Sequence, residues 1–259
     1  MQAAAATIKR IRGALEGSAG GILSAVAAHP AGVTEWQHYP PGEVYDLQTH
    51  AQFFYHAHPP AQRAPREHGH FHTFLRAEGM PAGVAPLILP ETAVARESTV
   101  SPQAPPLKLG RRDEVSYLVA IAVDSAGEPI RVFTTNRWVT GETWYRADDV
   151  IKMLDCFKFC AEGGPAVLNA WIAAIITLFR PQIAWLLRRR DETVTGWRQR
   201  RRTNVFEDTR LEVTSSFEID LDTQFGFLDQ FQTRDGAGST NRSGRLPRMT
   251  EGWGEGHAD

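Results

Sequence analysis

The 259-residue sequence predicts an α+β fold, in which a mainly antiparallel sheet with a histidine-rich hairpin packs against a long apolar helix. Three observations predict this class. Two neighbouring segments, 50–58 and 67–76, alternate in the manner of hairpin strands. The segment 115–124 is almost continuously apolar, which is typical of a central strand covered on both faces. The segment 165–190 is strongly apolar and indicates a buried core helix.

Composition limits the function classes and the domain organisation. A formal net charge of −2 gives no overall attraction to nucleic acid or to an anionic membrane. The two cysteines, Cys156 and Cys160, disfavour a secreted disulfide framework, so we expect a reducing compartment and a cytoplasmic location. Residues 1–232 are expected to form a single α+β domain that includes an N-terminal helical segment over 1–34. The Gly-, Arg- and Ser-rich tail, 233–259, is expected to be disordered.

In the first half of the chain, apolar residues at helical spacing predict a helix over 7–28. Its basic residues interrupt the apolar run that a signal peptide needs, and an ordinary helix fits better than an organelle-targeting one. Clustered prolines predict a shaped loop over 36–46, before the hairpin. After the hairpin, prolines break every short apolar run of 77–109, so we expect a lid, a binding loop or a mobile segment there.

In the second half, 130–138 is expected to return as the hairpin partner of the central strand. An aspartate-capped helix follows and ends near Cys160. The core helix 165–190 is expected to be kinked or restarted at Pro181, and its uninterrupted apolar part is shorter than the ~20 residues of a membrane span. Regular alternation over 211–221 predicts a half-buried strand.

The predicted hairpin concentrates histidines, since six of the nine in the chain lie within it. Side chains alternate between the two faces of a strand, so His56 and His58 share one face, as do His68, His70 and His72. The register that opposes His58 to His68 also places His56 opposite His70. Directly opposed Cβ atoms are about 4.5–5.5 Å apart, which allows the imidazoles to converge on one ion.

Neutral imidazole is the usual nitrogen ligand of transition metals in proteins. The sequence therefore predicts a divalent transition metal, with zinc or iron preferred and copper as a further option. The expected ligands are His56, His58, His70 and His72, while His68 is a spare ligand or a general base. The alternative is a row of partly buried histidines satisfied by ordinary hydrogen bonds. We favour the metal, because clustered imidazoles repel each other when protonated and need partners when neutral and buried.

Two carboxylates are candidate catalytic residues beside the histidines. Glu67 begins the second strand on the face opposite to His68, unless a bulge at Gly69 changes its direction. Glu43 lies with His38 in the proline-rich loop, and a carboxylate from this loop would complete a two-histidine, one-carboxylate site for ferrous iron. The alternative for this loop is a solvated turn.

A second cluster, TTNRWVTGETWY, follows a predicted strand. Its Arg137, Trp138, Glu142 and Trp144 have the composition of a pocket that orients a planar or anionic ligand. The alternative is that the tryptophans are core or rim residues and that Arg137 pairs with Glu142. The arginine-rich stretch from Arg188 to Arg202 fits a solvated helix end better than a nucleic-acid site.

The segments HYPPGEVYD, THAQFFYHAH, EHGHFHTFLR and TTNRWVTGETWY together resemble an uncharacterised bacterial family that is known only as a domain of unknown function. The resemblance covers about residues 36–221. It implies no activity, substrate or ligand.

The residues thus predict a metal-dependent enzyme that acts on a small molecule, with an anion as one option, by hydrolytic or oxidative chemistry. A non-catalytic metal carrier or sensor is the first alternative, and it predicts a coordinatively closed site without a pocket by Arg137. The second alternative is a nucleic-acid or partner-binding module that uses the Arg188–Arg202 stretch, with salt-dependent binding. The sequence does not predict an oligomeric state.

Overall fold

The computed structural model describes residues 1–27, 32–88, 114–160, 165–201 and 204–236. Its centre is a six-stranded sheet in the order β1-β2-β3-β5-β6-β8, in which every neighbouring pair is antiparallel. The strands are β1 (Tyr39–Tyr45), β2 (Ala51–His56), β3 (Gly69–Arg76), β5 (Val115–Val123), β6 (Pro129–Thr135) and β8 (Val213–Glu218). A separate two-stranded ribbon pairs β4 (Pro86–Ile88) with β7 (Trp144–Tyr145). The predicted α+β class is confirmed.

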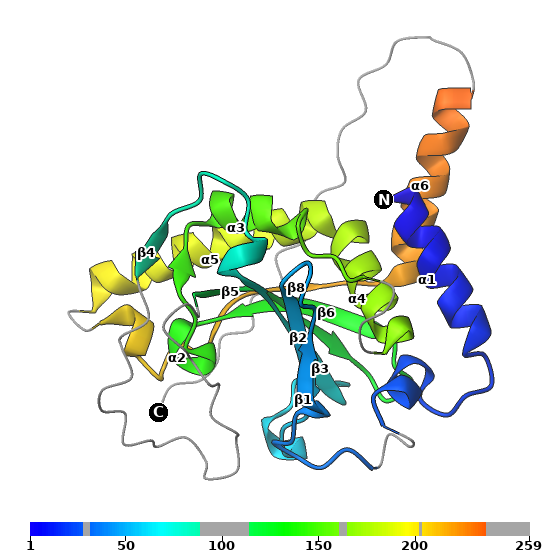
Figure 1. Cartoon of the computed structure of the whole chain (residues 1–259), viewed down its shortest axis with the longest axis horizontal. Coiled ribbons are helices and arrows are strands. Elements are labelled where there is room, and N and C mark those ends of the chain that lie inside the picture. Colours follow the sequence, from blue (N-terminus) through cyan, green and yellow to red (C-terminus); the bar gives the residue numbers. More distant parts are fainter. Residues whose placement is uncertain (28–31, 89–113, 161–164, 202–203, 237–259) are drawn as a thin grey trace.

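Helices cover one face of the sheet (Figure 1). They are α3 (Ala147–Leu154), α4 (Ala166–Leu178) and α5 (Arg180–Arg200). Helix α1 (Gln2–Ala14) packs beside α4, and α6 (Leu221–Gly236) lies beside α1. Helix α2 (Arg137–Thr140) is a short helix after β6. Short 3-10 helices lie at Gly21–Ala25, Pro60–Gln62, Ala77–Gly79 and Val205–Glu207. The main apolar core lies between this face and the helices, where Phe71 packs against Trp171. The histidines of β2 and β3 point to the opposite face.

Two predicted helices are divided. The predicted helix 7–28 is α1 followed by the 3-10 helix Gly21–Ala25, because Gly17, Gly20 and Gly21 adopt positive φ angles that end a regular helix. The predicted core helix is α4 and α5, which are bent by 73° at the break, with Pro181 in the first turn of α5.

The predictions for 36–46 and 211–221 need correction. The first segment contains β1, which tolerates Pro40 and Pro41 because it is the edge strand of the sheet and its outer side has no ladder partner among the described residues. The predicted strand 211–221 is shorter, because Asp220 accepts a hydrogen bond from the Thr223 backbone N–H at 2.7 Å and so starts α6.

Helix α6 continues to Gly236, so the first residues of the predicted tail are helical and 237–259 lie outside the described residues. Most of the proline-rich segment 77–109, from residue 89 on, also lies outside them. Within the described part of the chain, no single helix is long and apolar enough to cross a membrane. The bent pair α4 and α5 reaches the length and apolar composition of a membrane span only when the two helices are taken together.

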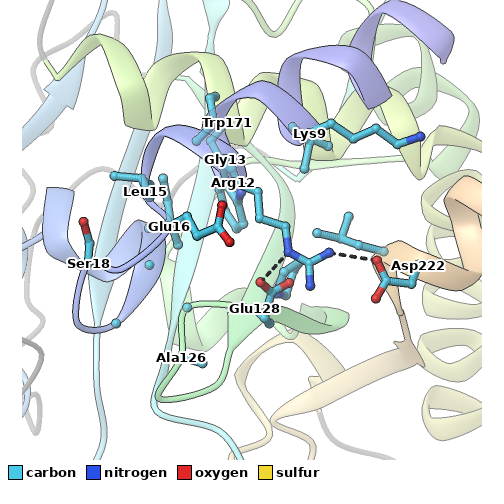
Figure 2. Close-up of a pocket in the computed structure, with 18 of the residues that line it drawn as sticks. Lys9, Arg12, Gly13, Leu15, Glu16, Ser18, Ala126, Glu128, Trp171 and Asp222 are labelled. Carbon is cyan, nitrogen blue, oxygen red and sulfur yellow. Dashed lines mark hydrogen bonds and ion pairs between the residues drawn. The ribbon is translucent and has the colours of Figure 1, made fainter.

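A pocket of about 570 Å³ lies between α1, the turn after β5 and the start of α6 (Figure 2). Arg12 crosses it and joins all three elements, with ion pairs to Glu128 at 3.1 Å and to Asp222 at 2.8 Å. These partners are exposed, so the pairs orient α1 while its apolar stripe, which includes Ile8, holds it on α4.

Candidate metal centre

The register of β2 and β3 brings three histidines together. His56 pairs with His70, and Phe54 pairs with His72, as the predicted register requires. Because residues two apart on a strand share a face, His70 and His72 point the same way as His56. Each of the three contributes one nitrogen to a group that could hold a metal ion.

The three Nε2 atoms lie at distances that suit one ion. They are separated by 2.8 Å between His56 and His70, 3.1 Å between His70 and His72, and 3.3 Å between His56 and His72. A tetrahedron with metal–nitrogen bonds of about 2.0–2.1 Å has an edge of roughly 3.3 Å. The group is therefore compact enough for a first coordination shell, with a slight expansion on binding.

The environment keeps two of these rings, those of His56 and His72, neutral. Burial, followed by the neighbouring imidazoles, lowers the pKa of His56 and His72 well below the ordinary 6.5. His72 is 2% exposed and His70 is 5% exposed. A neutral imidazole has a free lone pair for a metal, so His56 and His72 can bind without first losing a proton.

Outer hydrogen bonds orient two of the rings. Nδ1 of His70 lies 2.6 Å from Oε1 of Glu67, and Oε2 of Glu67 lies 2.6 Å from the guanidinium of Arg131. Burial would raise the pKa of Glu67, but His70 and Arg131 outweigh it and lower this pKa from 4.5 to about 2. Nδ1 of His72 lies 3.2 Å from the hydroxyl of Tyr117. Carboxylate and hydroxyl partners of this kind typically support metal-binding histidines.

Short side chains on β5 let β6 reach the centre. Ala122 and Ala120 lie between the histidines of β3 and the β6 residues Arg131 and Phe133, as the strand registers show. With only methyl groups between them, Phe133 approaches His70 to a ring-centroid distance of 5.1 Å. Tyr117, Arg131 and Phe133 were not among the predicted site residues, because their position depends on strand order.

The predicted faces of Glu67 and His68 are wrong and must be exchanged. Glu67 lies on the side of His70, whereas Nδ1 of His68 lies 2.6 Å from the hydroxyl of Tyr55 on the other face. The strand begins only at Gly69, and the preceding turn, with Arg66 at φ 67°, breaks the alternation. A Cβ atom at position 69 would lie 2.4 Å from the Tyr55 hydroxyl, so glycine at this position leaves room for the contact between His68 and Tyr55. His68 therefore loses the geometric basis for a role at the metal.

His58 lies beside the group of three, with its ring centroid 4.9 Å from that of His56 and 5.2 Å from that of His70. Its Nε2 is 3.2 Å from Nε2 of His56, and its ring is 4.5 Å from that of Trp36. Burial and then the charge of His70 lower the pKa of His58 to about 4. A fourth imidazole is thus available at the more exposed end of the site.

Glu43 does not point at the three histidines. Its carboxylate contacts Nδ1 of His38 at 3.0 Å and accepts a hydrogen bond from the side-chain amide of Gln52. The ring of His38 in turn stacks on Phe54. The predicted two-histidine, one-carboxylate arrangement is therefore replaced by a carboxylate that holds a further histidine.

The second predicted cluster makes contacts within the fold. Arg137 donates to the Glu142 backbone carbonyl at 3.1 Å and pairs with Glu207, and Trp138 donates to the Leu211 carbonyl at 2.9 Å. Trp144 is buried under the guanidinium of Arg190, 4.2 Å from its ring centroid.

Glu142 connects this cluster with the metal centre. Its carboxylate accepts a hydrogen bond at 2.7 Å from the backbone N–H of Tyr117, whose hydroxyl contacts His72. Burial raises the pKa of Glu142 to about 8, although Arg190 lowers it in part. The cluster thus supports the strand that carries Tyr117.

In the arginine-rich stretch, the first three arginines have acidic partners on α5 or the neighbouring α3. Arg188 pairs with Asp148, Arg189 with Glu192, and the buried Arg190 with Asp191. These contacts agree with a helix surface that is solvated and internally paired.

Comparisons with known proteins place the chain in a family. No curated protein and no solved structure matches it. A family model described as "Domain of unknown function (DUF6969)" matches residues 2–219, which include every element of the sheet and all three converging histidines. The chain therefore belongs to the DUF6969 family, in agreement with the resemblance to an uncharacterised family.

Proposed function

We propose that this protein is a metal-dependent enzyme whose His56, His70 and His72 bind one divalent transition metal, preferably zinc or iron, with copper as a further option. The convergence of their Nε2 atoms within 2.8–3.3 Å carries the proposal. Zinc there would supply an activated water for hydrolysis, and iron or copper would supply oxygen chemistry.

The tautomers explain why hydrogen bonding alone does not account for this arrangement. The Glu67 carboxylate only accepts hydrogen bonds, so in a neutral His70 ring Nδ1 carries the proton and Nε2 presents a lone pair. His72 has the same arrangement when its Nδ1 donates to Tyr117. Lone pairs that face one another at about 3 Å repel, and a cation between them removes this repulsion.

Two features support catalysis on a small molecule. Three protein ligands leave a further coordination position, as catalytic zinc sites do. Arg131 adds a positive charge beside His70, which suits an anionic group on the substrate. We also propose a cytoplasmic location, because both cysteines are free thiols.

A non-catalytic metal carrier or sensor is the second candidate. His58 favours it, because its Nε2 lies 3.2 Å from that of His56 and a small movement would make it a fourth ligand. Four histidine ligands would close a tetrahedral site and leave no position for a substrate.

Elemental analysis of untagged protein tests the metal site. We expect about one equivalent of metal in the wild type and none in the double variant His56→Ala/His70→Ala, with His50→Asn as the control because His50 contacts Tyr45 rather than the site. Unchanged metal content in the double variant refutes the proposal.

Azide added to the cobalt-loaded protein separates enzyme from carrier. An open position predicts a change in the visible spectrum as azide binds, whereas a closed four-histidine site predicts none.

A further inference from the structure

A further histidine, His38, lies beside the proposed ligands on the same side of the sheet. It immediately precedes β1, and its ring stacks on Phe54 with a centroid distance of 3.8 Å and an interplanar angle of 14°. Its ring centroid is 5.7 Å from that of His56. Phe54 itself lies 5.1 Å from His72, so His38 covers the part of the sheet directly next to the centre.

His38 is held by a chain of polar side chains. Arg76 donates to the Gln52 oxygen at 2.7 Å, the Gln52 amide donates to one Glu43 oxygen, and the other Glu43 oxygen is 3.0 Å from Nδ1 of His38. Glu43 adopts a left-handed backbone conformation, with φ 62°, which is uncommon outside glycine. The chain thus fixes both the position of His38 and the direction of its ring.

The same row of hydrogen-bonded side chains also sets the tautomer of His38. A carboxylate only accepts hydrogen bonds, and the Gln52 amide already donates to the second oxygen of Glu43. Nδ1 of neutral His38 must therefore carry the proton, and its Nε2 presents a lone pair that accepts no hydrogen bond from the described residues. Nε2 is an acceptor that remains available to a ligand.

The closed sides of the centre point to the direction from which a ligand approaches. His72 is fully enclosed, and His70 is backed by Glu67 and Phe133. His56 is more exposed than these two, and its ring neighbours both His38 and His58. The open coordination position therefore faces the side on which His38 and His58 lie.

We propose that His38 is a positioning residue whose Nε2 accepts a hydrogen bond from the molecule at the open coordination position of the metal. This inference rests on the proposed metal centre. The site then prefers ligands that bring an O–H or N–H group, such as water, an alcohol or an amine, over ligands that bring only lone pairs. Glu43 acts through His38, since it maintains the acceptor tautomer.

Azide is a suitable probe because it carries no hydrogen and must displace the metal-bound water. In cobalt-loaded wild-type protein, His38 holds that water and opposes azide. In His38→Phe, which keeps an aromatic ring on Phe54, we expect azide to bind about five-fold more tightly, the change that corresponds to one hydrogen bond of ~1 kcal/mol. Cobalt stoichiometry should not change.

Glu43→Gln gives a second and sharper readout. Gln52 still donates to the side-chain oxygen at position 43, so the new NH₂ group at position 43 faces Nδ1 of His38. Nδ1 must then accept a hydrogen bond, and the proton of the His38 ring moves to Nε2. We expect a gain in azide affinity at least as large as in His38→Phe, because Nε2–H now donates to azide. Nitrogen NMR of the metal-free protein should show His38 protonated at Nδ1 in the wild type and at Nε2 in Glu43→Gln. His50→Asn should match the wild type in both measurements.

The outcomes separate this inference from the proposed function. Failure of the wild type to bind cobalt removes the metal centre and this inference with it. Stoichiometric cobalt together with unchanged or weaker azide binding in His38→Phe overturns the role of His38 alone. An Nε2-protonated His38 in the metal-free wild type also overturns it, whether or not His38→Phe folds.

Discussion

Replacing Glu67 by glutamine tests the support of the metal centre most directly. Glu67 has a side chain that is 4% exposed, it accepts a hydrogen bond from His70, and it pairs with Arg131. These partners lower its pKa from 4.5 to about 2 in the folded protein. One pKa unit corresponds to about 1.4 kcal/mol, so the ionised carboxylate contributes at most about 3 kcal/mol to the free energy of unfolding.

The sign of the pH dependence follows from a folded pKa below the unfolded one. The contribution is fully present above pH 4.5 and is lost as the pH falls toward 2. The linkage relation gives a contribution of roughly 2 kcal/mol at pH 3.5, compared with roughly 3 kcal/mol at pH 7. The stability gap between wild type and Glu67→Gln should shrink accordingly.

Urea unfolding of the metal-free proteins at the two pH values measures this gap, with Glu16→Gln as a control because Glu16 is exposed. Metal competition at pH 7 should also show a 10- to 100-fold loss of affinity in Glu67→Gln, since the carboxylate orients a ligand. A gap that is absent, or that is the same at pH 7 and 3.5, would refute the assigned role of the carboxylate.

Three further predictions follow from other groups. Because burial lowers the pKa of His56 and His72 well below 6.5, zinc occupancy should stay constant from pH 7.5 to about 5.5; release near pH 6.5 in a dialysis series would contradict this. Burial raises the pKa of Glu142 to about 8, so its stabilising contribution is fully present below pH 4.5 and is lost as the pH rises through 8; Glu142→Gln should therefore unfold at higher urea than the wild type at pH 9. Arg12→Ala should lower the free energy of unfolding by less than about 1 kcal/mol, because its ion pairs are exposed, and metal content should not change.

Local sequence was sufficient to predict that His56 and His70 pair in the candidate site. Alternation fixes the face of a side chain within one strand, which places His70 and His72 together. The proline-rich connection brings the second strand back so that His56 opposes His70, as predicted. Alternation does not extend across a turn, which is why the faces of Glu67 and His68 were exchanged.

The remaining parts of the site depend on contacts between segments that are distant in the chain. Tyr117 contacts a histidine 45 residues earlier, and Arg131 reaches a carboxylate 64 residues earlier, because β3, β5 and β6 are neighbours in the sheet. His38 joins them only because β1 forms at the sheet edge despite its prolines. The sequence by itself determined which side chains share a face, since this follows from the two-residue repeat of a strand. Only the tertiary structure decided which strands lie side by side, and therefore which groups orient the imidazoles.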